Sequence, residues 1–135
     1  MTETLKLEIV TPTEIAFSAD VEMVTLPAIE GQMGVYPAHV RVITRIEPGE
    51  IIVQTNGRDR FLAVGEGLVE VTPTNVSIVT DMAIAAEHID EARAEEARAR
   101  AAARLREKIS DEEVATVNAS LVRSLAQLQV KRRKK

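Results

Sequence analysis

The sequence predicts two parts of different fold class, an all-β sandwich or flattened barrel over residues 1–86 and an antiparallel two-helix hairpin over residues 87–135. Three observations predict this division. Apolar residues in the first part alternate with period two, which is typical of half-buried strands. From Glu87 onward the sequence has no glycine or proline, and the apolar period becomes that of a helix. The charge divides as well, because residues 1–86 carry −7 and residues 87–135 carry +3.

The first part reads as strands separated by turns. Leu5, Leu7 and Ile9 alternate with polar residues, so they define one buried face. A two-residue hairpin turn requires positive φ at both central positions, and Asn56-Gly57 tolerates it. The other expected turns are Pro48-Gly49, Gly65-Glu66-Gly67 and Pro73-Thr74-Asn75. The predicted strands are 4–10, 15–17, 21–27, 40–46, 50–55, 58–64, 67–72 and 75–80.

The second part begins with an alanine-rich helix. Asp90 is the expected N-cap, and Glu96 and Arg100 have the i,i+4 spacing of an ion pair. The apolar face of this helix is Ala94, Ala97, Ala101, Leu105 and Ile109. A buried alanine contributes much less than the roughly 1.5–3 kcal/mol of a buried leucine. We therefore expect a weakly held hairpin that leans on the β domain, on another protein, or on each in turn.

The second helix begins at a capping box. Ser110 is placed to accept a hydrogen bond from the backbone of Glu113, whose side chain returns to Ser110. An apolar stripe follows at Val114, Val117, Leu121, Leu125 and Leu128. The two helices are predicted to form an antiparallel hairpin.

Composition excludes several classes of protein. The chain has 135 residues and is 45% hydrophobic, which suits a folded domain. It has no cysteine, so disulfides and thiolate metal sites are excluded. Its apolar runs are far shorter than the roughly 20 residues of a membrane-spanning helix, and the start carries no apolar signal region. We expect a soluble chain that stays on one side of a membrane.

One short segment, "EGQMGVYPAHV" from Glu30 to Val40, gathers glycines, a proline, the only tyrosine and His39. No second metal ligand lies at metal spacing, so no metal site is predicted. We expect His39 to stabilise a turn or an interface, the alternative being a general base in an enzyme. His88 is expected to be exposed near a helix start. Gly65-Glu66-Gly67 lacks the continuation of a phosphate-binding loop and is interpreted as a tight turn.

Two groups of charged residues leave alternatives open. The basic end, Lys131 to Lys135, suits nucleic acid or anionic lipid, or else a solvated helix end or a protein partner. Because Phe17, Tyr36 and Phe61 are the only aromatic residues, there is no stacking platform for bases, which favours the second interpretation. The second group could bind an anionic ligand or form a salt-bridged helix face. It comprises Asp90, Arg93, Arg100 and Arg123.

Several motifs together resemble the epsilon subunit of the bacterial F-type ATP synthase. The pattern "EGxxGxxPxHxxxxTxxxPGEI" stands at residues 30–51, "GxGLVEVxP" at residues 65–73, and "IDxxRA" at residues 89–94. Each motif alone is weak, but their order and spacing are specific and cover nearly the whole chain. The resemblance implies a non-catalytic rotor subunit of the central stalk, on the cytoplasmic side of the bacterial plasma membrane and attached to it only through the complex.

The resemblance also implies partners. The sandwich would contact the gamma subunit and the c ring, and the hairpin would either fold against the sandwich or extend towards the alpha and beta subunits and block ATP hydrolysis. It implies that the loop presented to the c ring and gamma is formed by Glu30, Gly31, Gln32, Met33, Gly34, Tyr36, Pro37 and His39. It implies an inhibitory tail that faces acidic segments of beta and consists of Arg123, Lys131, Arg132, Arg133, Lys134 and Lys135.

No cofactor is required by this interpretation, but ATP is a candidate regulatory ligand. Some members of the family bind ATP between the folded helices, and Asp90, Arg93, Arg100 and Arg123 match their pattern. Ile84 and Gln127 differ from it, because those members have an acidic residue and an arginine there. The competing hypothesis is a free-standing β-sandwich binding module whose basic helical tail binds nucleic acid or anionic lipid. An enzyme that uses His39 is the third.

Overall fold

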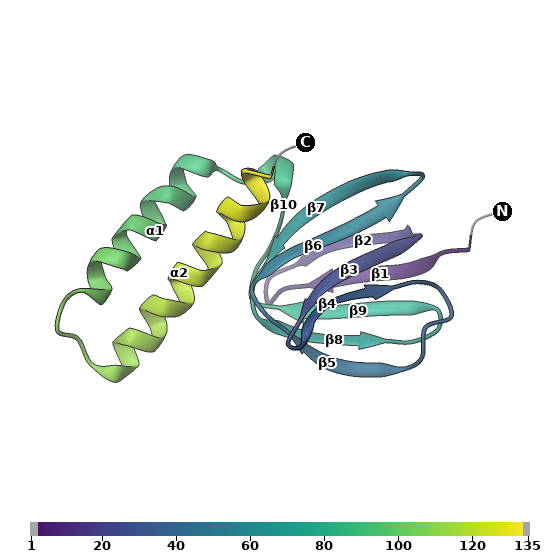
Figure 1. Ribbon diagram of the computed structural model, residues 1–135, viewed down its shortest axis with the longest axis horizontal. Helices are drawn as coiled ribbons and strands as arrows, with labels where there is room; N and C mark the ends of the chain where they lie inside the picture. Colours follow the sequence, from purple (N-terminus) through teal and green to yellow (C-terminus); the bar gives the residue numbers. More distant parts are fainter. Residues whose placement is uncertain (1–2, 134–135) are drawn as a thin grey trace.

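The computed structural model describes residues 3–133, which form a β-sandwich with a two-helix hairpin packed against one end (Figure 1). The predicted fold class is therefore confirmed. The described strands are β1 (Leu5–Val10), β2 (Ile15–Val21), β3 (Met23–Ala28), β4 (Gly31–Val35), β5 (Val42–Ile46), β6 (Gly49–Thr55), β7 (Arg58–Val64), β8 (Gly67–Val71), β9 (Asn75–Thr80) and β10 (Ala83–Ala85). A short 3-10 helix, η1 (Ala86–His88), leads to α1 (Glu91–Leu105) and α2 (Asp111–Lys131).

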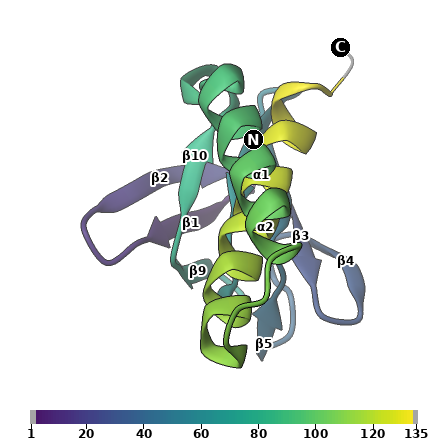
Figure 2. The same ribbon diagram turned by 90° about the vertical axis from the view of Figure 1, so that its left-hand side faces the viewer.

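The strands are joined by hydrogen bonds into one sheet that folds over on itself. Its order is β10-β7-β6-β3-β5-β8-β9-β1-β2, and β4 pairs with β3 beside this path. β1 runs parallel to β9, whereas the other pairs are antiparallel. The β1–β2 and β3–β4 hairpins project on opposite sides of the sandwich (Figure 2). The sheet thus encloses one core between its two halves.

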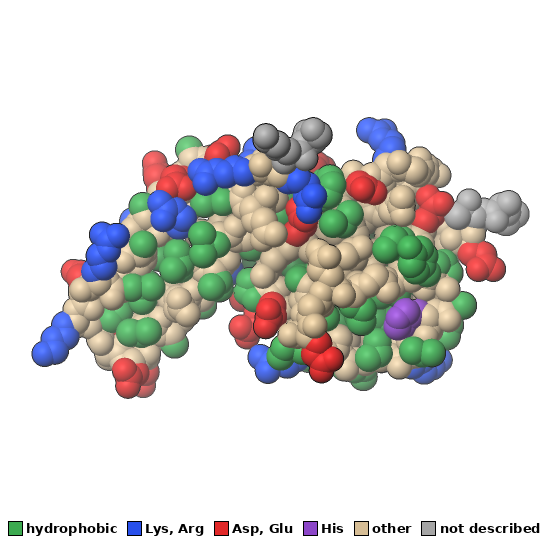
Figure 3. Space-filling view, in the orientation of Figure 1, with side chains coloured by type: hydrophobic (Ala, Val, Ile, Leu, Met, Phe, Trp, Pro, Cys, Tyr) green, Lys and Arg blue, Asp and Glu red, His purple; other side chains and the backbone are tan. Residues whose placement is uncertain are grey.

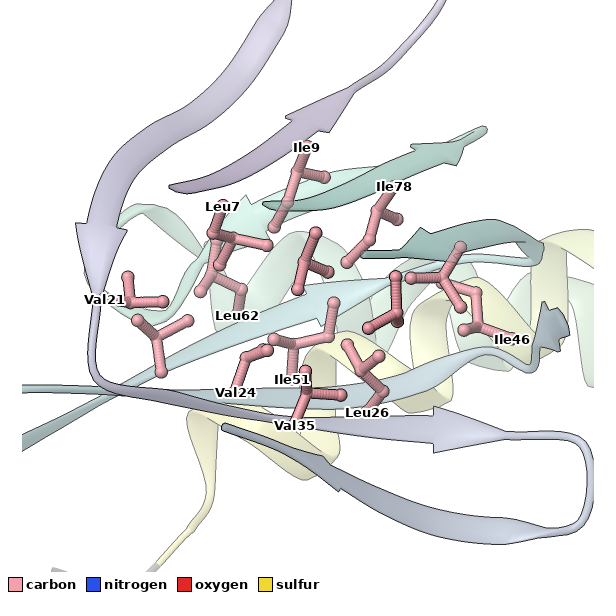
Figure 4. Packing of buried hydrophobic residues seen from close by; sticks show 14 of the residues in the cluster. Leu7, Ile9, Val21, Val24, Leu26, Val35, Ile46, Ile51, Leu62 and Ile78 are labelled. Atoms are coloured by element: carbon pink, nitrogen blue, oxygen red, sulfur yellow. The ribbon is translucent and has the colours of Figure 1, made fainter. Parts of the chain in front are cut away.

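The core is built from the inward positions of the strands (Figure 4). The alternation of Leu5, Leu7 and Ile9 predicted one buried face, and all three are fully buried. The largest of the other buried aliphatic side chains are Val21, Val24, Leu26, Val35, Ile46, Ile51, Val53, Leu62 and Ile78. The buried residues of this core come only from strands, so the sandwich does not need the helices to complete it.

All eight predicted strands are present, but the prediction missed two further strands. β4 lies in the glycine-rich segment that was expected to be a loop, where Met33 and Val35 alternate towards the core. β10 has only three residues and pairs with β7. The strand predicted at 15–17 continues to Val21, because the whole of it pairs with β1.

The turn at Asn56-Gly57 is confirmed. Asn56 has φ 51° and Gly57 has φ 72°, as the two central residues of a tight hairpin require. The backbone N–H of Asn56 also donates to the Glu22 carboxylate, which ties this turn to the start of β3. The turn at residues 65–67 likewise joins two strands, β7 and β8.

Both helix starts were predicted correctly. Asp90 accepts from the N–H of Arg93 at 3.1 Å, and Ser110 accepts from the N–H of Glu113 at 3.2 Å. The Glu113 carboxylate does not return to the backbone of Ser110; it lies 3.5 Å from the Ser110 hydroxyl and 2.6 Å from Arg104 of α1. The side chain of Arg104 is long enough to reach the Glu113 carboxylate, which therefore pairs with this arginine rather than with the backbone of Ser110.

Two details of the helix faces were wrong. The ion pair within α1 joins Glu95 to Arg98 rather than Glu96 to Arg100. Ile109 lies beyond the end of α1, which is Leu105. Leu125 of the predicted apolar stripe on α2 is 46% exposed and lines a groove that faces the sandwich.

The hairpin docks on the sandwich through α2. This helix packs on β6, β7 and η1, while α1 packs on α2. At the contact, Val130 of α2 joins Ala63 of β7 and Ile89 in a small apolar cluster. Phe61, Met82, Ile84 and Ala86 pack around it. The expectation that the hairpin leans on the β domain is met in this conformation.

Candidate functional site

The segment from Glu30 to His39 contains an edge strand and an exposed turn. β4 pairs with β3 from Gly31 to Val35, and among the described strands it has no second neighbour. Gly31 has φ 120°, a value that glycine adopts without strain. This geometry presents an open backbone edge rather than a loop, so the predicted contact would involve a strand.

The end of this segment is held by backbone contacts. Ala38 has φ 68°, and its N–H donates to Pro73 O at 2.8 Å. His39 Nδ1 donates to Val40 O at 2.7 Å, which fixes the imidazole in the turn. Tyr36 is 58% exposed beside Pro37. The structure therefore positions His39 as a turn-stabilising residue and brings it no acidic or nucleophilic partner within the described hydrogen bonds.

An aliphatic patch that sequence reasoning missed lies on the outer face of the sheet. Ile43 of β5, Leu68 of β8 and Val79 of β9 are 69%, 54% and 61% exposed. Leu68 and Val79 lie directly opposite each other on β8 and β9. On the other side of β8, Leu68 lies opposite Arg45 of β5, and Ile43 is two residues from Arg45 on that strand. We call these three residues the outer aliphatic patch. The sequence did contain a sign of this patch, because each of the three aliphatic residues stands at an outward strand position where the alternation favours a polar residue.

A cavity between the two helices brings together three of the four predicted ligand residues. Its volume is about 310 Å³, and Asp90, Arg93 and Arg100 line it. Ile84, His88, Ala94, Ala97, Ser124 and Gln127 complete the lining. Within residues 3–133, neither Arg93 nor Arg100 has an acidic partner within 4.0 Å. Both guanidinium groups are available for an anion.

Arg123 lies outside this cavity. Its Nη1 is 3.5 Å from Asp81 Oδ2, in the connection between β9 and β10. Gln127 is in the cavity lining, but its Nε2 donates to the Met82 sulfur at 3.1 Å. The structure thus separates Arg123 from Asp90, Arg93 and Arg100 in this conformation.

The described part of the basic tail is engaged within the chain. Arg132 Nε donates to Glu91 at 2.7 Å, and its Nη2 donates to Glu95 at 3.2 Å, so it ties the end of α2 to the start of α1. Lys131 donates to Ala86 O at 3.3 Å. Arg133 pairs with Glu50 of β6. Lys134 and Lys135 lie outside the described residues.

Charges of both signs are spread over the visible face of the hairpin (Figure 3). Hydrogen bonding to Arg98, with help from Arg132, lowers the pKa of Glu95 below its usual value of 4.5. The hydrogen bond to Glu91 raises the pKa of Arg132. These groups are exposed, so their ion pairs orient the helices more than they stabilise them.

The described residues contain no group of three or more side chains placed to hold a metal ion. None of their helices has the length and apolar character needed to cross a bilayer.

Comparison with known proteins assigns both parts. The beta-sandwich domain of the ATP synthase Delta/Epsilon chain matches residues 4–86, and the long alpha-helix domain of that chain matches residues 87–132. The sequence is 39% identical over 126 residues to the ATP synthase epsilon chain of Herpetosiphon aurantiacus, with 93% of each chain covered. It is also 39% identical over 127 residues to that of Alkalilimnicola ehrlichii, covering 93% and 91% of the two chains.

Solved structures share the fold. A chain in the Euglena gracilis mitochondrial ATP synthase matches with a TM-score of 0.74 and 22% identity, over 88% of this chain and 76% of that one. A chain in the central stalk and c-ring structure of the Tetrahymena thermophila mitochondrial ATP synthase matches with a TM-score of 0.63 and 11% identity, over 96% and 98%.

Proposed function

The chain belongs to the ATP synthase delta/epsilon family, and from this premise we propose that it is a non-catalytic rotor subunit in the central stalk of a bacterial F-type ATP synthase. In this role it couples rotation of the c ring to the gamma subunit. Its place is the cytoplasmic side of the plasma membrane, where the complex holds it. We also propose that residues 1–86 and 87–135 act as separate functional parts, one for anchoring and one for regulation.

The sandwich is the anchoring part of this proposal. Its outer aliphatic patch brings together three large aliphatic side chains that are each more than half exposed, and such clusters are typical of protein–protein contacts. The segment from Glu30 to His39 offers an open strand edge and Tyr36, an aromatic side chain of the kind enriched at protein interfaces. These two surfaces are the proposed contacts with gamma and the c ring.

The hairpin is the regulatory part. The observation that carries this proposal is that the buried core of the sandwich contains no helix residue, so the hairpin can leave without opening it. The helices pack through small side chains, since the buried residues of α1 are Ala94 and Ala101. In the extended position, the tail from Arg123 to Lys135 would reach acidic segments of the beta subunit within the alpha–beta ring and restrain ATP hydrolysis.

The test is the ATP hydrolysis rate of a matching alpha–beta–gamma core stripped of its own epsilon subunit. The full chain and residues 1–86 are added separately, and binding to gamma is measured for both. We expect both to bind and only the full chain to slow hydrolysis. If neither binds gamma, the rotor proposal is wrong and the free-standing binding module takes its place. If both slow hydrolysis equally, the hairpin is not the brake.

ATP is the proposed regulatory ligand of the cavity between the helices. Support comes from Arg93 and Arg100, two cations without acidic partners in the described chain, on the same cavity. Ile84 and Gln127 add no charge to this lining, so we expect weak binding. Calorimetric titration with ATP should give a binding signal that disappears in Arg93→Ala and persists in Arg106→Ala, a change outside the cavity. A signal unaffected by Arg93→Ala would exclude this site.

A further inference from the structure

Glu50 is the only charged residue that is buried within residues 3–133. Its side chain is 4% exposed. It follows Gly49 at the start of β6 and lies opposite Ala63 of β7. Because the next residue, Ile51, points into the core, Glu50 points to the outer face of these strands, where α2 packs. An ionised carboxylate is costly to bury unless it is paired.

Arg133, just after the end of α2, supplies the partner. Its Nε donates to Glu50 Oε2 at 2.7 Å, and its Nη2 donates to Glu50 Oε1. The guanidinium carbon of Arg133 also lies 4.6 Å from the centre of the Phe61 ring. The carboxylate therefore receives two parallel hydrogen bonds, while the flat face of the guanidinium covers an aromatic ring.

This arrangement fits a guanidinium group better than an ammonium group. A guanidinium is planar, carries its donors in a fixed fork and stacks on aromatic rings. A lysine ammonium is a point charge that cannot form the two-donor pair and the ring contact with the same geometry. The site thus distinguishes arginine from lysine, although both occur in the basic tail.

We propose that Glu50 and Phe61 form a guanidinium-binding site on the sandwich, and that Arg133 is the ligand that fastens the hairpin in its docked position. The site is formed by β6 and β7 and persists when the hairpin leaves. When the hairpin leaves, Glu50 becomes exposed to water and its carboxylate is hydrated again. When the hairpin docks, the carboxylate is buried and needs Arg133 as its partner.

The other polar contacts of the hairpin are poorer candidates for this role. Arg132, the preceding residue, binds Glu91 and Glu95, which both belong to α1, so it joins helix to helix. The Arg123–Asp81 pair does reach the sandwich, but at 3.5 Å and with side chains 37% and 48% exposed. Among the described ion pairs, Arg133–Glu50 alone joins the hairpin to a buried acid of the sandwich.

The experiment measures the ratio of released to docked hairpin in the isolated full-length chain. Because the chain has no cysteine, Ser77→Cys and Lys108→Cys give two exposed, uniquely labelled positions, one on β9 and one between the helices. Electron spin resonance distances between spin labels report the two populations. We expect Arg133→Ala to raise the ratio about 30-fold, or about 2 kcal/mol, since removal of one partner leaves a buried carboxylate.

Two further variants test the chemistry of the site. Arg133→Lys keeps the charge but should still raise the ratio at least about tenfold. Arg132→Ala removes the neighbouring arginine and should leave the ratio within about threefold of wild type. A wild-type ratio in Arg133→Ala or Arg133→Lys would overturn the proposal. So would an equal effect of Arg132→Ala, because charge near the helix end would then suffice.

Chemical rescue guards against an indirect effect of the variant. In Arg133→Ala, guanidinium chloride below denaturing concentration should restore the docked population, whereas methylammonium chloride at the same concentration should not. Equal rescue by both salts, or by neither, would count against a guanidinium site. A Glu50→Met, Arg133→Met double variant should dock better than either single variant, since replacing both partners removes the buried charge; additive effects would contradict the pairing.

The consequence for ATP hydrolysis rests on the proposed function. Release of the hairpin by Glu50→Gln, which leaves every cation of the proposed inhibitory tail in place, should strengthen inhibition of the alpha–beta–gamma core. If the variant releases the hairpin but inhibition is unchanged, the guanidinium site stands and the proposed brake is wrong. If the hairpin stays docked in the variant, the site is wrong whatever the hydrolysis rate.

Discussion

The carboxylate of Asp81 occupies the space that a side chain on Gly65 would fill. A Cβ at Gly65 would overlap Asp81 Oδ1, while the other oxygen of the same carboxylate faces Arg123 of α2. A side chain at Gly65 would therefore displace the Asp81 carboxylate, the acid that meets Arg123 of the hairpin.

Gly65→Ala should lower the free energy of unfolding by about 1–3 kcal/mol, because Asp81 or the turn must shift to make room. Urea denaturation followed by circular dichroism measures this change. Gly34→Ala is the matched control, since its Cβ would meet only the flexible end of Met23, at 3.1 Å. An equal loss in both variants would mean that backbone freedom rather than the contact with Asp81 decides the cost.

Ser110→Ala should destabilise the start of α2 by about 1 kcal/mol, because the N–H of Glu113 loses its acceptor. Amide hydrogen exchange in residues 111–116 should become faster by about fivefold, as that energy implies. Asn118→Ala, an exposed change within the same helix, should not accelerate it. Unchanged exchange in Ser110→Ala would show that the cap does not limit local opening.

The hairpin should lose part of its stability in acid through Glu95. Because Arg98 and Arg132 lower the pKa of Glu95 in the folded chain, its contribution is present above the usual value of 4.5 and is lost as the pH falls through the lowered pKa. Hydrogen exchange of α1 measured across this range should respond more weakly to pH in Glu95→Gln. Glu96→Gln is the control, since Glu96 is not in the network. Identical pH profiles for wild type and Glu95→Gln would refute the assignment.

Charge on the outer aliphatic patch should prevent assembly while leaving the fold intact. Ile43→Glu and Leu68→Glu place a carboxylate on a surface that we propose is buried against gamma, and each should weaken gamma binding at least about tenfold. Their unfolding midpoints should stay close to wild type because both side chains are exposed. Val114→Glu, an exposed aliphatic position on α2, is the control. Unaltered gamma binding would place the interface elsewhere.

Local signals in the sequence predicted the fold class, the tight turn at Asn56-Gly57 and both helix caps, because each depends on residues close together in the chain. β4 was missed since Gly31 and Gly34 have low strand propensity and the strand forms only by pairing with β3. β10 was missed for a similar reason, since it has only three residues and forms only by pairing with β7.

Among the candidate site residues, too, those close together in the chain could be predicted and those with distant partners could not. Asp90 and Arg93 share the first turn of α1, and Arg100 lies two turns further along the same helix, so their convergence could be predicted. Arg123 could not be placed, because its partner Asp81 lies 42 residues away. The Arg133–Glu50 pair spans 83 residues, and a single sequence contains no pattern that links two such positions.

The parallel pairing of β1 with β9 has a consequence for the order of folding. Residues Lys6–Val10 can pair with β2 early, but their parallel partners, Asn75–Val79, are synthesised much later, so the sheet closes through contacts distant in sequence. The helices emerge from the ribosome after those residues, when the surface they dock on can already be complete. Because the core of the sandwich contains strand residues only, the hairpin can dock on a finished sheet, and its release undoes a docking step without unfolding that core.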